Sequence, residues 1–157
     1  MEYKISATEA FKKYSDMVYR LAFARVKNKY DADDILQEVF LRFIKCSNKA
    51  NNDEHVKALL IRITINCSKS MLSSSWFKKT EPLGENLSVS DPEFDTLDAV
   101  LRLPQKYRTV IHLHYYMGYG VDEIAEILKS KPSTVKSWLY RARQKLKITL
   151  EGDEVNV

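Results

Sequence analysis

Residues 121–147 read VDEIAEILKSKPSTVKSWLYRARQKLK, and this stretch decides the fold of the C-terminal part of the chain. Its first ten residues predict a short amphipathic helix with an inner face made of Ile124, Ile127 and Leu128. A turn follows at KSKP, and apolar residues then recur at helical spacing: Val135, Leu139, Ala142 and Leu146. Two short helices joined by a tight turn, the second of them basic, form the layout of a helix-turn-helix motif.

The second of these helices carries an uneven charge. Residues 133–147 include five basic residues and no acidic one, whereas a solvated helix face usually mixes its signs because neighbouring like charges repel. Burial of the apolar stripe would turn the opposite side outward, and the N–H groups of the first turn favour a phosphate. We therefore predict that this helix binds duplex DNA through Lys131, Ser133, Thr134, Lys136, Ser137, Tyr140, Arg141 and Arg143.

These side chains suit different parts of a duplex. Lys136 and Arg141 have the donors to reach guanine edges in the major groove, and Ser137 can bond to either kind of base. Tyr140 can pack on a sugar or a thymine methyl group. Phosphate contacts are expected from the basic residues further along the helix, Arg143, Lys145 and Lys147. Two alternatives stay open for the charge: a solvated basic helix, or a helix that binds an acidic protein partner.

The N-terminal part of the chain predicts three further helices, near residues 8–27, 31–46 and 53–72. We expect Asp31 to be the N-cap of the second helix, with more acids in its first turn. The first two helices show apolar stripes at positions Phe11, Tyr14, Val18, Leu21 and Arg25, and then Ala32, Ile35, Leu36, Val39, Phe40, Phe43 and Ile44. The third is apolar on more than one side and is therefore expected at the centre of a three-helix unit, with Ile63, Ile65 and Leu72 in its core.

Composition then shifts between the two helical parts. Residues 80–98 hold six acids and no base, whereas residues 1–79 hold 15 bases and nine acids, and residues 99–147 hold ten bases and three acids. The chain is thus basic, acidic and basic again. We predict an all-α protein with a helical domain at 1–77, an acidic flexible linker at 78–91, a helix-turn-helix domain at 92–150 and a tail at 151–157. Asp91 and Pro92 are a start signal for the first helix of the second domain.

Several other classes of protein fit the sequence poorly. A run of about 18 apolar residues, which a membrane span would need, is missing, and the N-terminus lacks the pattern of an export signal. Cys46 and Cys67 do not form a CxxC pair and are expected to be reduced, so we predict a cytoplasmic protein. His112 and His114 are two residues apart on a helix and point different ways. We therefore expect neither an enzyme nor a cofactor or metal site.

Two segments resemble one known family. Residues 103–147, LPQKYRTVIHLHYYMGYGVDEIAEILKSKPSTVKSWLYRARQKLK, look like region 4 of bacterial sigma factors of the sigma-70 family, in the extracytoplasmic-function group. Residues 19–45, YRLAFARVKNKYDADDILQEVFLRFIK, resemble region 2 of the same group, whose hallmark is an Asp-Ala-Glu-Asp-Leu-x-Gln-Glu pattern that here reads DADDILQE. The two motifs stand in the order of the family, and the resemblance covers about residues 10–148.

The resemblance implies a division of labour. Region 2 of the group docks on a coiled coil of the largest RNA polymerase subunit, which here implies a polymerase-binding face made of Asp33, Asp34, Gln37, Glu38 and Leu41. Without the family, a merely soluble helix face is the preferred interpretation, and exposed Leu41 is the one feature that favours contact. The linker of the group occupies a nucleic-acid channel of polymerase. Region 4 binds the upstream −35 element, and a separate anti-sigma factor is expected to control the protein.

Region 2 of the group also opens the −10 element, which calls for aromatic and basic side chains near unstacked bases. The implied residues here are Arg62, Asn66, Lys69, Trp76 and Lys78. Asn66 matches an asparagine that the group often has, whereas Ser70 and Ser73 replace the usual aspartate and arginine, so the base preference is open. Trp138 replaces a common arginine of region 4. It either covers apolar surface beside the turn or lies against a phosphate–sugar track.

Two other functions stay open on the residues alone. A stand-alone helix-turn-helix regulator with a helical sensing or dimerisation domain would bind duplex DNA without polymerase. An adaptor protein would need no DNA at all. The sigma-factor hypothesis differs from both, because it predicts specific transcription only together with core RNA polymerase and promoter DNA.

Overall fold

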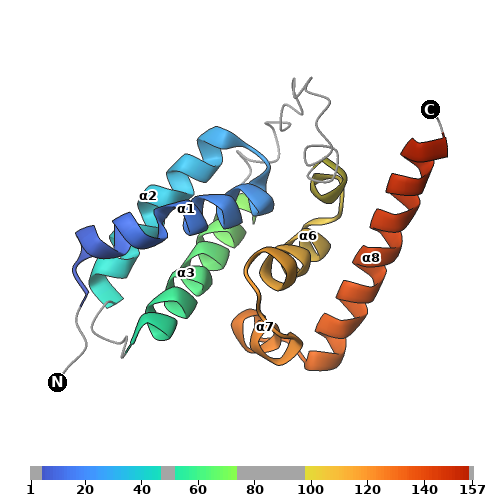
Figure 1. Ribbon diagram of the computed structural model, residues 1–157. Coiled ribbons are helices and arrows are strands. Elements are labelled where there is room, and N and C mark those ends of the chain that lie inside the picture. Colours follow the sequence, from blue (N-terminus) through green and yellow to red (C-terminus); the bar gives the residue numbers. More distant parts are fainter. Residues whose placement is uncertain (1–4, 47–51, 74–97, 156–157) are drawn as a thin grey trace. The chain divides into compact units, whose positions relative to one another are not determined.

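The computed structural model describes residues 5–46, 52–73 and 98–155, and every regular element in these ranges is a helix (Figure 1). The chain divides into two units, residues 1–83 and 84–157, and each is described by itself. The first unit contains α1 (Ala7–Val26), α2 (Lys29–Cys46) and α3 (Asp53–Ser73). The second contains α6 (Gln105–Ile111), the π-helix η2 (His112–Tyr116), α7 (Val121–Leu128) and α8 (Pro132–Val155). None of the described helices is long and apolar enough to cross a membrane.

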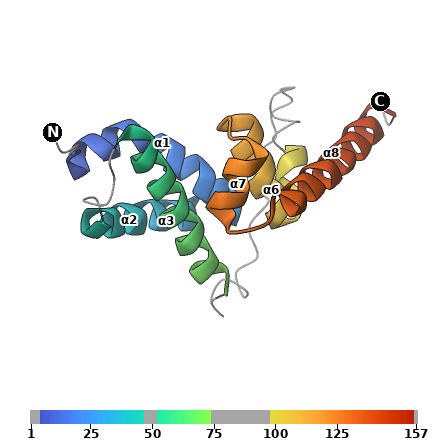
Figure 2. The ribbon, with the colours of Figure 1, turned by 90° about the horizontal axis from the view of Figure 1, so that it is seen from below.

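The three helices of the first unit all pack against one another, as Figures 1 and 2 show from two directions. Their shared core confirms the predicted stripes at most positions, since one face of each helix supplies buried apolar side chains: Tyr14, Val18, Ala22, Ala32, Ile35, Val39, Phe43, Val56, Leu60 and Ile63. Ile65 is buried too, whereas the side chain of Leu72 lies outside those described. Hydrophobic burial on a shared seam therefore holds this unit together.

The start of α2 differs from the prediction. The structure begins the helix at Lys29, and the Asn28 side chain is the cap, because its Oδ1 accepts hydrogen bonds from the N–H groups of Tyr30 (2.8 Å) and Asp31 (3.2 Å). The prediction of Asp31 as the N-cap was therefore wrong by three positions. Asp31 lies in the first turn, where the helix dipole favours an acid. Lys27 ends α1 in the left-handed conformation, so the connection is only two residues long.

Two residues of the predicted apolar stripes are exposed. The side chain of Phe11 is 45% exposed and that of Ile44 is 55% exposed, since both lie at the margins of their stripes. Phe11 still contacts the core, edge-on against Phe40 with 5.0 Å between ring centroids. Arg25, by contrast, is buried as predicted, and its Nε donates a hydrogen bond of 2.8 Å to Ser68 Oγ on α3.

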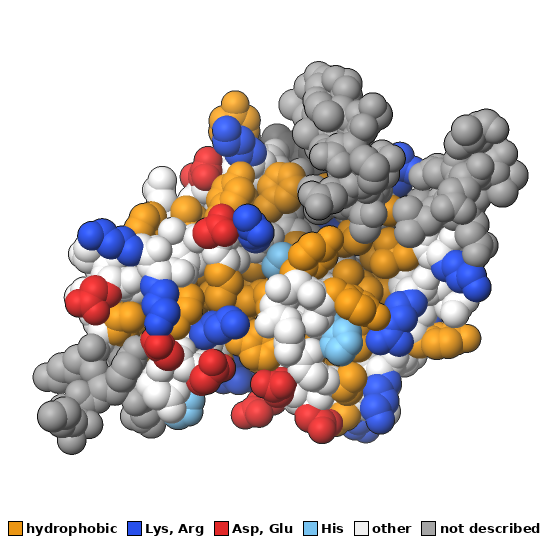
Figure 3. Space-filling model, in the orientation of Figure 1, with side chains coloured by type: hydrophobic (Ala, Val, Ile, Leu, Met, Phe, Trp, Pro, Cys, Tyr) orange, Lys and Arg blue, Asp and Glu red, His pale blue; other side chains and the backbone are white. Residues whose placement is uncertain are grey.

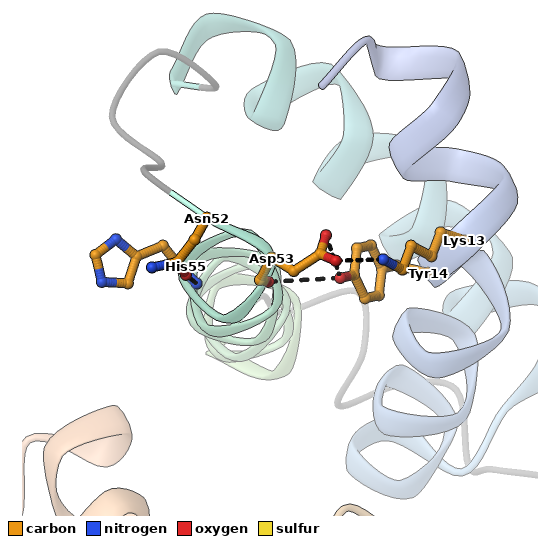
Figure 4. Close-up of polar contacts among 5 residues, drawn as sticks. All are labelled: Lys13, Tyr14, Asn52, Asp53 and His55. Atoms are coloured by element: carbon orange, nitrogen blue, oxygen red, sulfur yellow. Dashed lines mark hydrogen bonds and ion pairs between the residues drawn. The ribbon is translucent and has the colours of Figure 1, made fainter. Parts of the chain in front are cut away.

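A polar cluster joins the start of α3 to α1 (Figure 4). Lys13 Nζ lies 2.5 Å from Asp53 Oδ2, and the Tyr14 hydroxyl lies 3.2 Å from Asp53 Oδ1. Burial and the neighbouring carboxylate of Asp53 raise the pKa of Tyr14, so this hydroxyl stays protonated as a donor. Asn52 caps α3 by accepting a hydrogen bond of 2.9 Å from the His55 N–H. The first turn of α3 is thus attached to α1 by directional bonds as well as by packing.

A proline and a glycine mark helix boundaries in the second unit. Pro104 precedes α6, and Gly118 has a φ of +79°, which a residue with a side chain rarely adopts. Arg108 is buried, and its Nη1 donates a hydrogen bond of 2.6 Å to the Leu103 carbonyl. Burial lowers the pKa of Arg108 to about 10, so it remains charged at neutral pH. The expected start signal at Asp91 and Pro92 lies outside the described residues.

We predict that Leu60→Ala lowers the free energy of unfolding by about 2–5 kcal/mol, because it leaves a cavity at a fully buried position. The matched variant Leu41→Ala should cost less than about 0.5 kcal/mol, because Leu41 is 59% exposed. Urea denaturation followed by circular dichroism measures both values. Similar losses for the two variants would contradict the core assignment.

Candidate nucleic-acid and protein interfaces

The orientation of α8 follows from its packing against α6 and α7. Val135, Leu139 and Ala142 are at most 1% exposed, and Leu146 is half-buried, as the periodicity predicted. The turn before α8 is tight: Lys129 takes the left-handed conformation, and the Ser130 N–H donates a hydrogen bond of 2.9 Å to the Ala125 carbonyl. The predicted helix-turn-helix is therefore present as α7, this turn and α8.

The side of α8 opposite the buried stripe is basic. Figure 3 shows blue side chains along the part of α8 seen in that view. Six of the predicted DNA-binding residues are exposed, namely Lys131, Ser133, Lys136, Tyr140, Arg141 and Arg143. The other two, Thr134 and Ser137, are half-buried. Since residues 132–147 contain no acid, this outward face offers hydrogen-bond donors and positive charge over about four turns.

Trp138 lies at the edge of this face. Its side chain is half-buried, and Lys106 Nζ of α6 is 5.8 Å from the centroid of its ring. The same ammonium group is 5.3 Å from the Tyr107 ring, so Lys106 lies near two aromatic rings, within the range of a cation–π contact. Trp138 thus lies beside the Lys106 side chain of α6.

The π-helix η2 brings a residue to α8 that the sequence prediction missed. Tyr115 and Tyr116 are both more than half exposed, and the Met117 N–H donates to the His112 carbonyl five residues earlier (3.1 Å). The Tyr115 hydroxyl accepts a hydrogen bond of 2.6 Å from Nε of Arg143 on α8. The two residues are 28 positions apart, and no periodicity or motif signals such a contact.

The predicted protein-binding residues share one side of α2. Asp34, Gln37, Glu38 and Leu41 are exposed, and Asp33 is half-buried. Arg42 Nε donates a hydrogen bond of 2.9 Å to Glu38 Oε1, so the later part of this face is a carboxylate–guanidinium pair beside Leu41. With Leu41 and Ile44 both more than half exposed, the face combines acidic, polar and apolar groups.

The candidate single-strand residues are only partly described. Arg62, Asn66 and Lys69 are exposed and spaced by four and three residues, which places them on one side of α3. Ser70 Oγ donates a hydrogen bond of 3.3 Å to the Asn66 carbonyl. Trp76 and Lys78 lie outside the described residues, as does the predicted linker at 78–91.

His112 and His114 take structural positions in the second unit. His112 stacks on Tyr116 with 5.5 Å between ring centroids, and His114 Nδ1 donates a hydrogen bond of 2.8 Å to the Tyr119 carbonyl. Over the described parts of the chain, no group of three or more potential ligands could hold a metal ion.

Comparison with known proteins identifies both units. Residues 10–77 match the family described as sigma-70 region 2, and residues 94–146 match sigma-70 region 4. The RNA polymerase sigma factor SigV of Bacillus subtilis is 31% identical over 146 residues, which are 88% of this chain and 87% of SigV. The ECF RNA polymerase sigma factor SigW of the same organism is 28% identical and covers 85% of this chain and 83% of SigW.

A solved structure has the same fold. The sigma factor RpoE of Bartonella quintana, determined in complex with the anti-sigma factor NepR, aligns with a TM-score of 0.76. The alignment covers 92% of this chain and 96% of RpoE at 18% sequence identity. At that identity the likeness concerns the fold alone, and it agrees with the all-helical prediction.

Proposed function

Because the chain belongs to the extracytoplasmic-function group of the sigma-70 family, and is a sigma factor, we propose that its two helical units divide the work of transcription initiation. The second unit would bind the −35 element through α8, and the first would bind core RNA polymerase through α2. One observation carries the proposal: the basic side of α8 is exposed because the opposite side is buried.

The first step of the argument concerns the duplex. An exposed helix with Arg141 and Lys136 on its outer side can enter the major groove and donate to guanine edges. Ser133 and Thr134 lie in the first turn, where the N–H groups of the helix favour a phosphate. Because Trp138 is turned toward Lys106 of α6, base recognition is assigned to the neighbouring Lys136, Ser137, Tyr140 and Arg141.

The second step concerns polymerase. Asp34, Gln37, Glu38 and Leu41 offer acidic and apolar contacts on one side of α2, and an acidic face repels DNA phosphates. A protein partner with basic and apolar side chains fits it better, so this face is assigned to the core enzyme. On α3, the exposed Arg62, Asn66 and Lys69 are assigned to the opened −10 element, together with Trp76 and Lys78.

The third step concerns the inhibition of this protein and the compartment in which it acts. RpoE was solved with an anti-sigma factor, and we infer that an inhibitory protein also binds this chain. The chain would act in the cytoplasm, where core polymerase and promoters are found. It would catalyse no reaction and would need no cofactor, since its contribution is promoter choice and opening.

Transcription in vitro tests the function directly. Core polymerase with this chain should start transcripts at specific promoters, and core polymerase alone should not. A stand-alone regulator would bind its duplex site without polymerase and would not confer initiation. If core polymerase together with this chain started no transcripts at specific promoters, the proposal would be contradicted.

Arg141→Ala should relax the preference for one upstream base by about 1–3 kcal/mol, because a bidentate contact to that base is lost. The measurement is selection of duplexes from a random library by the holoenzyme, followed by sequencing. Arg143→Ala is the matched control, because loss of a phosphate contact should weaken all duplexes equally. If Arg141→Ala weakened binding to all duplexes equally, Arg141 would make only a phosphate contact.

Gln37→Ala combined with Glu38→Ala should weaken core-polymerase binding while helix content stays unchanged, because both side chains are exposed. Pull-down of core enzyme measures the binding. The control is Asp16→Ala with Arg20→Ala, which removes an exposed ion pair of α1 that matches the Glu38–Arg42 pair. Unchanged retention of core enzyme by the α2 variant would remove this face from the docking role.

A further inference from the structure

We propose that Tyr115 is a positioning residue that orients Arg143 of α8 toward a DNA phosphate, an inference that rests on the proposed function of α8. The observation is a contact between the two exposed side chains. Arg143 Nε donates a hydrogen bond of 2.6 Å to the Tyr115 hydroxyl, and the guanidinium carbon lies 5.7 Å from the centroid of the tyrosine ring. The hydrogen bond therefore holds the guanidinium group beside the hydroxyl end of the tyrosine ring.

The hydrogen bond to Tyr115 uses Nε–H, the one donor of Arg143 outside the fork that can bind a phosphate. Arginine carries five N–H donors, and the fork formed by Nη1 and Nη2 holds four of them. Two parallel bonds from that fork match two oxygens of one phosphate. Because Tyr115 takes Nε, the fork keeps its capacity for a phosphate while the side chain loses part of its rotational freedom.

The position of Arg143 on α8 suits a phosphate. Residues 136, 140 and 143 are spaced by four and three, so Arg143 lies on the same side of the helix as Lys136 and Tyr140. Arg143 is two turns beyond Lys136, on the margin nearest η2. A guanidinium fixed there would contact the backbone beside the groove that Lys136 and Arg141 enter.

Tyr115 is itself held in place. The His114 ring meets the Tyr115 ring edge-on, with 4.8 Å between centroids and an interplanar angle of 83°. His114 is tied in turn to the Tyr119 carbonyl by the hydrogen bond of 2.8 Å from Nδ1. The i to i+5 bond of the π-helix widens this turn, which changes the direction of the residues that follow His112. The series from Tyr119 through His114 and Tyr115 to Arg143 links the wide turn to the DNA-binding helix.

Pre-orientation should raise affinity because a long side chain otherwise loses rotamer entropy when it binds. Removing the Tyr115 hydroxyl restores that cost at the moment of binding, and we expect a loss of roughly two- to tenfold in affinity for duplex DNA. The positive charge of Arg143 remains, so the salt dependence should not change. Removing Arg143 itself should reduce the slope of log affinity against log salt by about 0.9, the share of one phosphate.

The experiment measures binding of the holoenzyme to a selected promoter duplex at several salt concentrations. The variants are Tyr115→Phe, Arg143→Ala and the two combined. Tyr116→Phe is the matched control, since Tyr116 is the adjacent exposed tyrosine and stacks on His112. Circular dichroism and urea midpoints establish that each variant is folded. Arg141→Ala serves as the independent test of DNA binding by α8.

The proposal expects a loss for Tyr115→Phe that disappears in the Arg143→Ala background, an unchanged slope for Tyr115→Phe, and no effect of Tyr116→Phe. It is overturned if Tyr115→Phe binds like the unaltered protein, or if its loss is the same with and without Arg143, while Arg141→Ala still weakens binding. If neither Arg141→Ala nor Arg143→Ala changes binding, the assignment of α8 to DNA fails as well, and both proposals fall.

Discussion

Burial of a single apolar stripe on α8 is the constraint from which the exposed basic face of this helix follows. Val135, Leu139 and Ala142 lose contact with water against α6 and α7, and each buried methylene contributes about 0.8 kcal/mol. A helix held along one side cannot rotate without exposing that stripe. Lys136 and Arg141 are therefore presented to the outside by packing on the opposite side. The direction in which the basic face points thus depends on residues on the opposite side of the helix.

Burial of apolar stripes also orients the three helices of the first unit. Polar bonds are added there, because packing alone would allow one helix to slide along another. Arg25 reaches Ser68 across the α1–α3 contact, and Asp53 joins the start of α3 to Lys13 and Tyr14. A directional bond at each end of α3 fixes its position along α1 as well as its rotation. The exposed sides of α2 and α3 are in this way held at defined places, although the residues on those two sides lie outside the core.

The two units are alike in design but opposite in the chemistry of their surfaces. α2 exposes acids and Leu41, which suits a protein, whereas α8 exposes bases and Tyr140, which suits a duplex. A sigma factor needs both partners at once, and under the proposed assignment surfaces of opposite sign would keep each partner on its own unit. The proposed role of Tyr115 would add a finer level of control, because Arg143 would be ordered before the DNA arrives.

Local periodicity determined much of this protein. The helices near residues 8–27, 31–46 and 53–72, the helix-turn-helix and the outward side of α8 all follow from apolar spacing, because a helix repeats every 3.6 residues whatever surrounds it. Tertiary structure alone decided the rest. It left Phe11 and Ile44 exposed at the margins of their stripes and brought Tyr115 to Arg143. Those outcomes depend on where neighbouring helices end and how closely they approach. The spacing of apolar residues within one helix does not determine its distance from another helix.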